Sequence, residues 1–261
     1  MSTRLFSFSG EALGAIEWCD PVAGETLVAD SWRVESGWAV ALERHRNRFF
    51  TSARQHGLEN AHLSSFWDSV IQAIPREGSW FPRVEVVATP GGPTLRYRER
   101  PAPEWLAEAV VAQAQTDPRT QPLTKGPDLE ALMALRRSVA HTGATEALIV
   151  SPDGTIIEGA YSTIVVIPPG GDELRIVPRT LPRIPSVTEA VIIEIADKRG
   201  VRVVEAPLAL AGLEGSDLWV LSALHGIRIA TDFPGGPALS PDTARRSEWQ
   251  SQWWDTKQKL G

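Results

Sequence analysis

The chain has 261 residues, which suits one large domain or two modest ones, and its hydrophobic fraction of 43% is ordinary for a globular protein. A net charge of −6 argues against a nucleic-acid partner, because such binding requires a basic face. The sequence lacks an apolar run long enough to span a bilayer, and its single cysteine, Cys19, excludes an internal disulfide. We therefore expect a cytoplasmic protein with no membrane partner, in which Cys19 is a small buried residue.

The first half of the chain predicts short strands and two helices. Apolar residues at helical spacing indicate helices over 45–56 and 64–74. Residues 103–115 are compatible with a helix or an extended segment. Alternating patterns and turn residues indicate strands at 26–29, 32–34, 38–42, 83–88 and 94–100.

The second half begins with residues 116–124, a polar, proline-bearing stretch without periodicity that we interpret as a linker. Amphipathic spacing then predicts a helix over 128–141, and Pro185 with Ser186 predicts the start of a helix over 185–199. A short helix is expected at 208–213. Strands are expected at 146–150, 155–158, 161–167, 201–206, 217–221 and 227–230. Strands and helices that mix without a βαβ rhythm predict an α+β fold.

Lys125 stands out because it is the only lysine before Lys198, in a chain whose other cations are almost all arginines. Arginine can replace lysine as a surface charge but not as an amine nucleophile, since a guanidinium stays protonated. Rarity alone is compatible with an ordinary surface lysine. The residues that follow it decide between the two interpretations.

An amphipathic helix and the segment EALIVSPDGTIIEG, Glu146–Gly159, follow Lys125. This order of lysine, helix, E-A-L strand, D-G turn and E-G resembles the pyridoxal 5′-phosphate (PLP) enzymes of fold type IV. That group includes class IV aminotransferases and aminodeoxychorismate lyase. The resemblance covers most of the chain and implies that Lys125 forms the Schiff base with PLP and moves protons as a base. It also implies that Glu158 lies at the pyridine nitrogen; the alternative is a carboxylate at a strand end.

The resemblance implies further contacts with the cofactor. Arg48, in His45-x-x-Arg48, resembles the family arginine that grips the phosphate. The backbone amides of Val187 and Thr188, at a helix start, resemble a second phosphate contact, although Pro185-Ser186 could equally be plain helix capping. Ser222 and Ala223, at a strand end, resemble a third phosphate contact. Ser162 and Thr163, which follow E-G, are expected to place hydroxyls near the cofactor.

Substrate contacts are expected on the strand at 94–100. Arg96, Arg98 and Arg100 alternate and therefore share one face. The preceding T-P-G-G-P turn resembles the loop that presents an arginine to the substrate carboxylate in this family, and Arg96 and Arg98 are the better placed for that role. The alternative is the solvated face of a hairpin. Ser31 resembles a threonine near the cofactor in the lyase branch.

The resemblance implies a smaller N-terminal α/β domain, 1–115, a linker, 116–124, and a larger C-terminal pseudo-barrel domain, 125–261. It further implies a homodimer that uses PLP, with no metal, and a small amino- or keto-acid substrate. Three functions stay open: an aminotransferase, a lyase that gives 4-aminobenzoate and pyruvate for folate synthesis, and a catalytically silent binding protein on the same scaffold.

Overall fold

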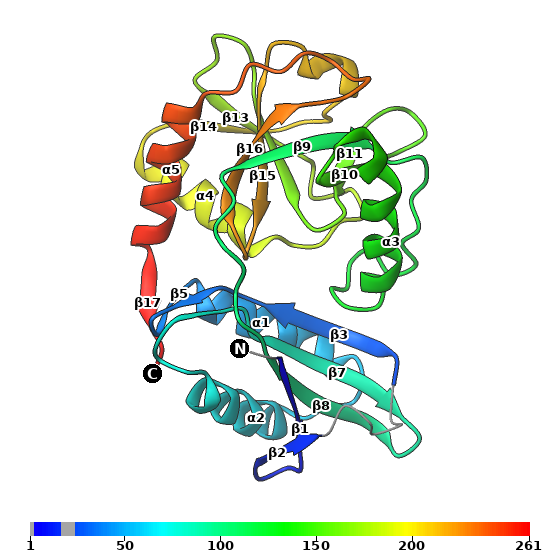
Figure 1. Ribbon diagram of the computed structural model, residues 1–261, viewed down its shortest axis with the longest axis vertical. Helices are drawn as coiled ribbons and strands as arrows, with labels where there is room; N and C mark the ends of the chain where they lie inside the picture. The colour runs from blue at the N-terminus through cyan, green and yellow to red at the C-terminus, as the bar shows by residue number, and fades with distance from the viewer. Residues whose placement is uncertain (1–2, 17–23) are drawn as a thin grey trace. The chain divides into compact units, whose positions relative to one another are not determined.

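The computed structural model describes residues 3–16 and 24–261, so Cys19 lies outside the described residues. The chain divides into two compact units (Figure 1). The first comprises Met1–Glu104, Thr124–Pro127 and Thr256–Gly261, and the second comprises Trp105–Leu123 and Asp128–Asp255. Lys125 thus belongs to the first unit. Residues up to Leu123, in the stretch expected to be a linker, belong to the second.

The first unit is built on an antiparallel sheet of order β2-β1-β8-β7-β3. Helices α1 (Leu42–Arg54) and α2 (Asn60–Ala73) pack on one face through residues such as Phe49 and Phe66. A small second sheet has the order β17-β5-β4-β6. The strands are β1 (Arg4–Phe8), β2 (Leu13–Ile16), β3 (Thr26–Ser31), β4 (Val34–Glu35), β5 (Trp38–Val40), β6 (Ser79–Trp80), β7 (Arg83–Thr89), β8 (Gly92–Glu99) and β17 (Lys257–Lys259).

The second unit is built on a mixed sheet of order β11-β10-β9-β16-β15-β12-β13-β14. The stretch 103–115 contains no helix and instead forms the strand β9 (Glu108–Gln113), which pairs in parallel with both β10 and β16. The remaining strands are β10 (Glu146–Val150), β11 (Ile156–Gly159), β12 (Thr163–Ile167), β13 (Glu173–Ile176), β14 (Arg202–Glu205), β15 (Asp217–Ser222) and β16 (Gly226–Asp232).

Helices cover this sheet, and those expected at 128–141, 185–199 and 208–213 are present, whereas α5 (Thr243–Asp255) was not expected. Helix α3 (Leu129–Val139) continues as a 3₁₀ turn, η1 (Ala140–Thr142), and packs through Leu132 and Leu135. Helix α4 (Val187–Lys198) is capped by Ser186, whose Oγ accepts a hydrogen bond from the Glu189 amide at 3.2 Å. The short helix is η2 (Leu210–Leu213), and α5 follows β16. The mixed content confirms the α+β class.

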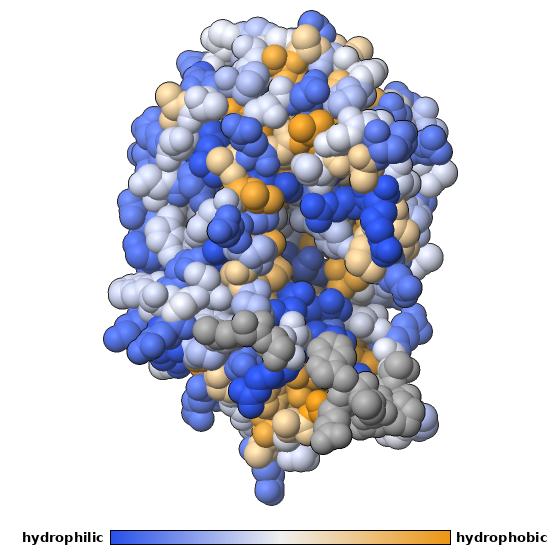
Figure 2. Space-filling view, viewed as in Figure 1, coloured by the Kyte–Doolittle hydropathy of each residue, from blue (hydrophilic) through white to orange (hydrophobic). Residues whose placement is uncertain are grey.

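None of the helices in the described part of the chain is long and apolar enough to cross a bilayer. On the face in Figure 2, hydrophobic residues are scattered among hydrophilic ones.

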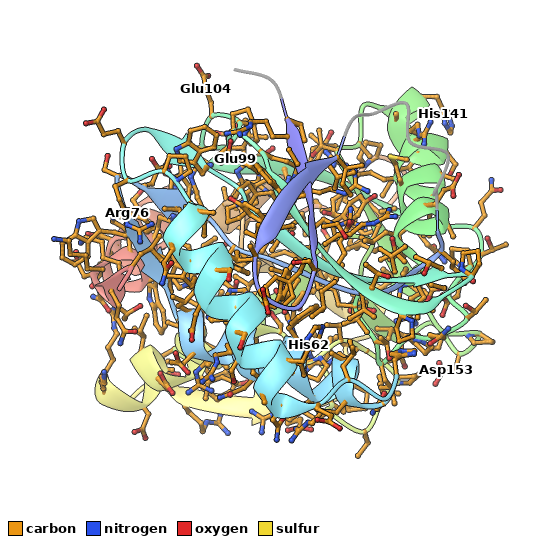
Figure 3. All side chains as sticks on the ribbon, turned by 90° about the horizontal axis from the view of Figure 1, so that it is seen from below. His62, Arg76, Glu99, Glu104, His141 and Asp153 are labelled. Carbon is orange, nitrogen blue, oxygen red and sulfur yellow. The ribbon has the colours of Figure 1, made fainter. Side chains whose placement is uncertain are left out.

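The two strands of the β10–β11 hairpin are joined by an exposed turn. Gly154 adopts a φ of 84° there, and Asp153 accepts hydrogen bonds from Ser151 and Thr155 (Figure 3).

Candidate active site

Lys125 is fixed against the edge strand β3 by its own backbone. Its carbonyl oxygen accepts a hydrogen bond from the Ala29 amide at 2.7 Å. The next residue, Gly126, has a φ of 138°, and a Cβ there would lie 2.6 Å from the Ala29 nitrogen and 2.7 Å from the Val28 carbonyl carbon. Only glycine permits this approach of two backbones, so the sequence Lys125-Gly126 has a structural reason.

A buried cluster in the same unit surrounds Asp30 on β3. Arg48 donates from Nε to Oδ2 at 2.7 Å and from Nη2 to Oδ1 at 2.8 Å. His45 Nδ1 lies 2.8 Å from Oδ1. The Asp30 side chain is fully buried, and that of Arg48 is 15% exposed. The His45-x-x-Arg48 pattern on α1 therefore presents both side chains to one carboxylate.

Electrostatics connect this cluster to Lys125. Burial would raise the pKa of Asp30, but the charges and hydrogen bonds of Arg48 and His45 hold it well below its usual range. Burial lowers the pKa of His45 against the opposing effect of Asp30, and the positive charges of Arg48 and Lys125 lower it further. Ala29, which bonds to the Lys125 backbone, directly precedes Asp30, which pairs with Arg48, so two of the residues expected to hold the cofactor lie at the same part of β3. Asp30 is not among the residues predicted from the sequence; a lone aspartate inside an apolar strand is the signal that could have indicated it.

Glu158 is the centre of a second cluster, in the second unit. It is 5% exposed, and its Oε1 accepts from Arg119 Nη1 while Oε2 accepts from the Ile184 amide at 3.3 Å. Arg119 also donates to the Pro182 carbonyl at 2.8 Å. Glu158 is therefore not a solvated carboxylate at a strand end. It joins β11 to the segment that leads into α4.

The expected phosphate contacts at α4 lie at the end of that segment. Ser186 caps the helix as described, which confirms its capping role. The first amides of a helix have no intrahelical acceptor, and here these belong to Val187 and Thr188, both buried. At the strand end of β15, Ser222 Oγ accepts from the His225 amide at 3.2 Å, so this hydroxyl stabilises the turn that contains Ala223.

The hydroxyls after Glu158 are buried as well. Ser162 is 7% exposed and Thr163 is 4% exposed. Ser162 Oγ has no hydrogen-bond partner among the described residues, and it lies where a Cβ on Gly159 would approach it to 2.1 Å. A buried hydroxyl without a protein partner fits a polar ligand that supplies one, so this part of the chain fits a cofactor such as PLP.

The arginine face of β8 surrounds a buried carboxylate. Glu85, on β7, is fully buried and accepts from Arg98 Nε at 2.8 Å and pairs with Arg83 Nη2 at 2.7 Å. Arg96, which faces Glu85 across the strands, is 7% exposed. Arg100 donates to Ser31 Oγ at 3.2 Å, and burial, with the charges of Arg83 and Arg98, lowers its pKa to about 10. This face is therefore largely buried and positively charged, unlike a solvated hairpin.

The sequence-predicted site residues thus divide between the two units. The first unit contains Lys125, Arg48, Ser31, Arg96 and Arg98. The second contains Glu158, Ser162, Thr163, Val187, Thr188, Ser222 and Ala223. Asp30, Glu85 and Arg119 contact these residues, and the sequence did not indicate them.

Comparison with known proteins identifies the class. Residues 27–233 match the class IV amino-transferase family, so the chain belongs to this family of PLP-dependent transferases. A PLP-bound hypothetical aminotransferase from Mycobacterium tuberculosis is similar in structure, with a TM-score of 0.80, 20% identity, and coverage of 97% of this chain and 98% of that one. A branched-chain aminotransferase from Thermoproteus uzoniensis has a TM-score of 0.81, 14% identity, and coverage of 99% and 100%. A fold IV transaminase from Curtobacterium pusillum has a TM-score of 0.78, 17% identity, and coverage of 97% and 99%. No match was found among curated proteins.

Proposed function

We propose that this protein is an aminotransferase that acts on a small, carboxylate-bearing amine, with Lys125 as the residue that attaches PLP. The observation that carries the proposal is the placement of Lys125 beside β3, next to the His45 and Arg48 cluster on Asp30. When bound, PLP supplies an electron sink for the substrate's α-carbon. The ε-amine of Lys125 would then serve as the base that moves a proton from the substrate's α-carbon to C4′ of the cofactor.

The other side chains bind and orient the cofactor in this proposal. Arg48 and the amides of Val187 and Thr188 bind the phosphate, since a guanidinium and a helix start both favour an anion. Glu158 lies at the pyridine nitrogen and keeps it protonated. Further cofactor contacts in this proposal come from Ser162, Thr163, Ser222 and Ala223. The orphaned Ser162 Oγ supports this part of the proposal.

Arg96 and Arg98 bind the substrate carboxylate, with Ser31 beside them. The support for this role is the positive charge of their strand face, on which Glu85 pairs with Arg83 and Arg98 and lies opposite Arg96 in the strand register. The likeness to known structures supports an amino- or keto-acid substrate. The Mycobacterium tuberculosis protein is also known with α-ketoglutarate and PMP bound, and the Thermoproteus uzoniensis protein with norvaline. We further propose that the protein works as a cytoplasmic homodimer, as its family membership suggests.

Two measurements on one sample test the function. Purified protein mixed with PLP should develop a visible band near about 410–430 nm, whose position depends on how the protein tunes the cofactor. Protein that stays colourless would be a catalytically silent member of the family. The coloured form is then incubated with L- and D-amino acids and with aminodeoxychorismate. Formation of PMP supports the aminotransferase, whereas pyruvate from aminodeoxychorismate identifies the lyase instead.

A further inference from the structure

Arg119 lies between two carboxylates in the second unit, with its side chain only 1% exposed. Its Nε and Nη2 donate to the two oxygens of Asp117 at 2.8 and 2.7 Å. Its Nη1 donates to Glu158 Oε1 and to the Pro182 carbonyl oxygen at 2.8 Å. All these bonds lie in one rigid guanidinium, so the plane of Arg119 is fixed by residues from three parts of the chain.

The charge of Arg119 matters because Glu158 is buried. A buried carboxylate without a compensating charge takes up a proton instead of staying ionised. Burial would lower the pKa of Arg119, but its bonds to Asp117 and the charge of Glu158 raise it, so Arg119 remains a cation. Arg119 therefore supplies the positive charge that an ionised Glu158 requires in this setting.

We propose that Arg119 is a positioning residue that keeps the Glu158 carboxylate ionised and oriented toward the pyridine nitrogen of the cofactor. The proposal rests on the proposed function, which puts Glu158 at that nitrogen. Asp117, whose side chain is 34% exposed, is the outer support of the arrangement. Asp117 accepts hydrogen bonds from Nε and Nη2 of the Arg119 guanidinium, and this orientation points Nη1 at Glu158.

The test measures how the visible band of the bound cofactor titrates with pH. Without an ionised carboxylate beside it, the pyridine nitrogen loses its proton. The nitrogen that links the cofactor to Lys125 then becomes more basic, so its titration midpoint moves to higher pH. Arg119→Gln should retain PLP and raise the midpoint of this titration by about one pH unit or more, as should Glu158→Gln. The double variant should shift no further than Glu158→Gln alone, because Arg119 acts through Glu158. Arg119→Lys, which keeps the charge but not the fork, should recover part of the shift.

Arg175→Gln is the matched control, because Arg175 also pairs with a buried glutamate, Glu173 at 2.7 Å, in the same unit. Its midpoint should equal that of the wild type. If Arg119→Gln does not fold, Asp117→Asn replaces it and should give a smaller shift in the same direction.

A wild-type midpoint in the Arg119→Gln or Asp117→Asn protein would overturn the proposal, and so would additive shifts in the double variant. Failure of the proposed function gives a different result. In that case the wild type takes up no PLP, or Glu158→Gln leaves the midpoint unchanged.

Discussion

Arg48 makes a two-pronged ion pair with the fully buried carboxylate of Asp30, from Nε at 2.7 Å and from Nη2 at 2.8 Å. This geometry fixes the plane of the guanidinium, because two parallel hydrogen bonds allow one orientation. His45, one turn earlier on α1, contacts the same carboxylate at 2.8 Å. Asp30 thus fixes the orientation of Arg48, the residue proposed to bind the phosphate of PLP.

Asp30→Asn should destabilise the protein and weaken PLP binding. Removing one partner of a buried pair leaves the other charge uncompensated, which costs about 3–5 kcal/mol. The dissociation constant for PLP should rise by about tenfold or more, which corresponds to about 1.4 kcal/mol. Denaturant unfolding and absorbance titration with PLP measure the two effects. The control is Glu99→Gln, a buried carboxylate of β8 that pairs with Arg4 at 3.3 Å (Figure 3). Equal loss of PLP affinity in both variants would contradict a specific role for Asp30.

Gly126→Ala should impair attachment of PLP to Lys125. The new Cβ would lie 2.6 Å from the Ala29 nitrogen, so the backbone that carries Lys125 must move away from β3. The positive φ adds strain of about 1 kcal/mol or more. Gly154→Ala separates the two causes, since Gly154 also has a positive φ, but apart from its chain neighbours no described residue would lie within 4 Å of the added Cβ. We expect lower stability in both variants and slower PLP uptake only in Gly126→Ala. Normal uptake there would mean that the contact with Ala29 does not position Lys125.

Ser162→Ala should leave stability unchanged or increase it while it weakens PLP binding. The buried Oγ has no partner among the described residues, so its removal breaks no hydrogen bond within that part of the chain. A lost hydrogen bond to the cofactor should raise the dissociation constant about fivefold, or about 1 kcal/mol. Ser216→Ala is matched, because Ser216 Oγ is likewise buried without a partner in the described structure. It should not alter PLP affinity; a similar loss in both would contradict a contact from Ser162.

Stability should depend on pH through Asp217, which is 3% exposed on β15. Burial raises the pKa of Asp217 to about 6, despite its bond from Trp219 Nε1 at 3.1 Å. The folded state therefore binds this proton more tightly than the unfolded chain does. The contribution of Asp217 is most favourable below pH about 4 and is lost as pH rises toward about 6, by at most about 3 kcal/mol.

Asp217→Asn should accordingly unfold at a higher temperature than the wild type at pH 8, with a smaller difference at pH 4. Thermal unfolding at both pH values measures this. Asp242→Asn serves as control, since Asp242 lies near the same Arg245, at 3.4 Å, but is 41% exposed. A stabilisation of Asp217→Asn that does not change with pH would contradict the titration of this carboxyl.

Much of the second unit could be predicted because its signals are local. Helices α3 and α4 follow from apolar spacing and from the cap at Ser186, and the β10–β11 hairpin follows from its Asp153-Gly154 turn. The sequence alone could not decide whether residues 103–115 form a helix or an extended segment. Strand β9 pairs with β10 and β16, and both occur later in the chain.

The contacts that hold the site were harder to foresee because they join distant residues. Asp30 lies 18 residues before Arg48, and Arg119 lies 39 residues before Glu158. Arg119 also lies in a polar stretch without periodicity, a pattern that is typical of a linker. The order of motifs in the sequence was enough to predict Lys125, Arg48 and Glu158 as candidate site residues. Their buried partners, such as Asp30 and Arg119, could be identified only in the structure.

Attachment of PLP to Lys125 is the central claim, and chemical trapping tests it most directly. The protein is loaded with PLP and reduced with borohydride, which makes a lysine linkage permanent, and its peptides are then mapped by mass spectrometry. The chain has only four lysines, so the assignment is unambiguous. We predict the added mass on the peptide that contains Lys125, and its loss in Lys125→Arg. A label on Lys198, Lys257 or Lys259 instead, or on no lysine, would contradict the account.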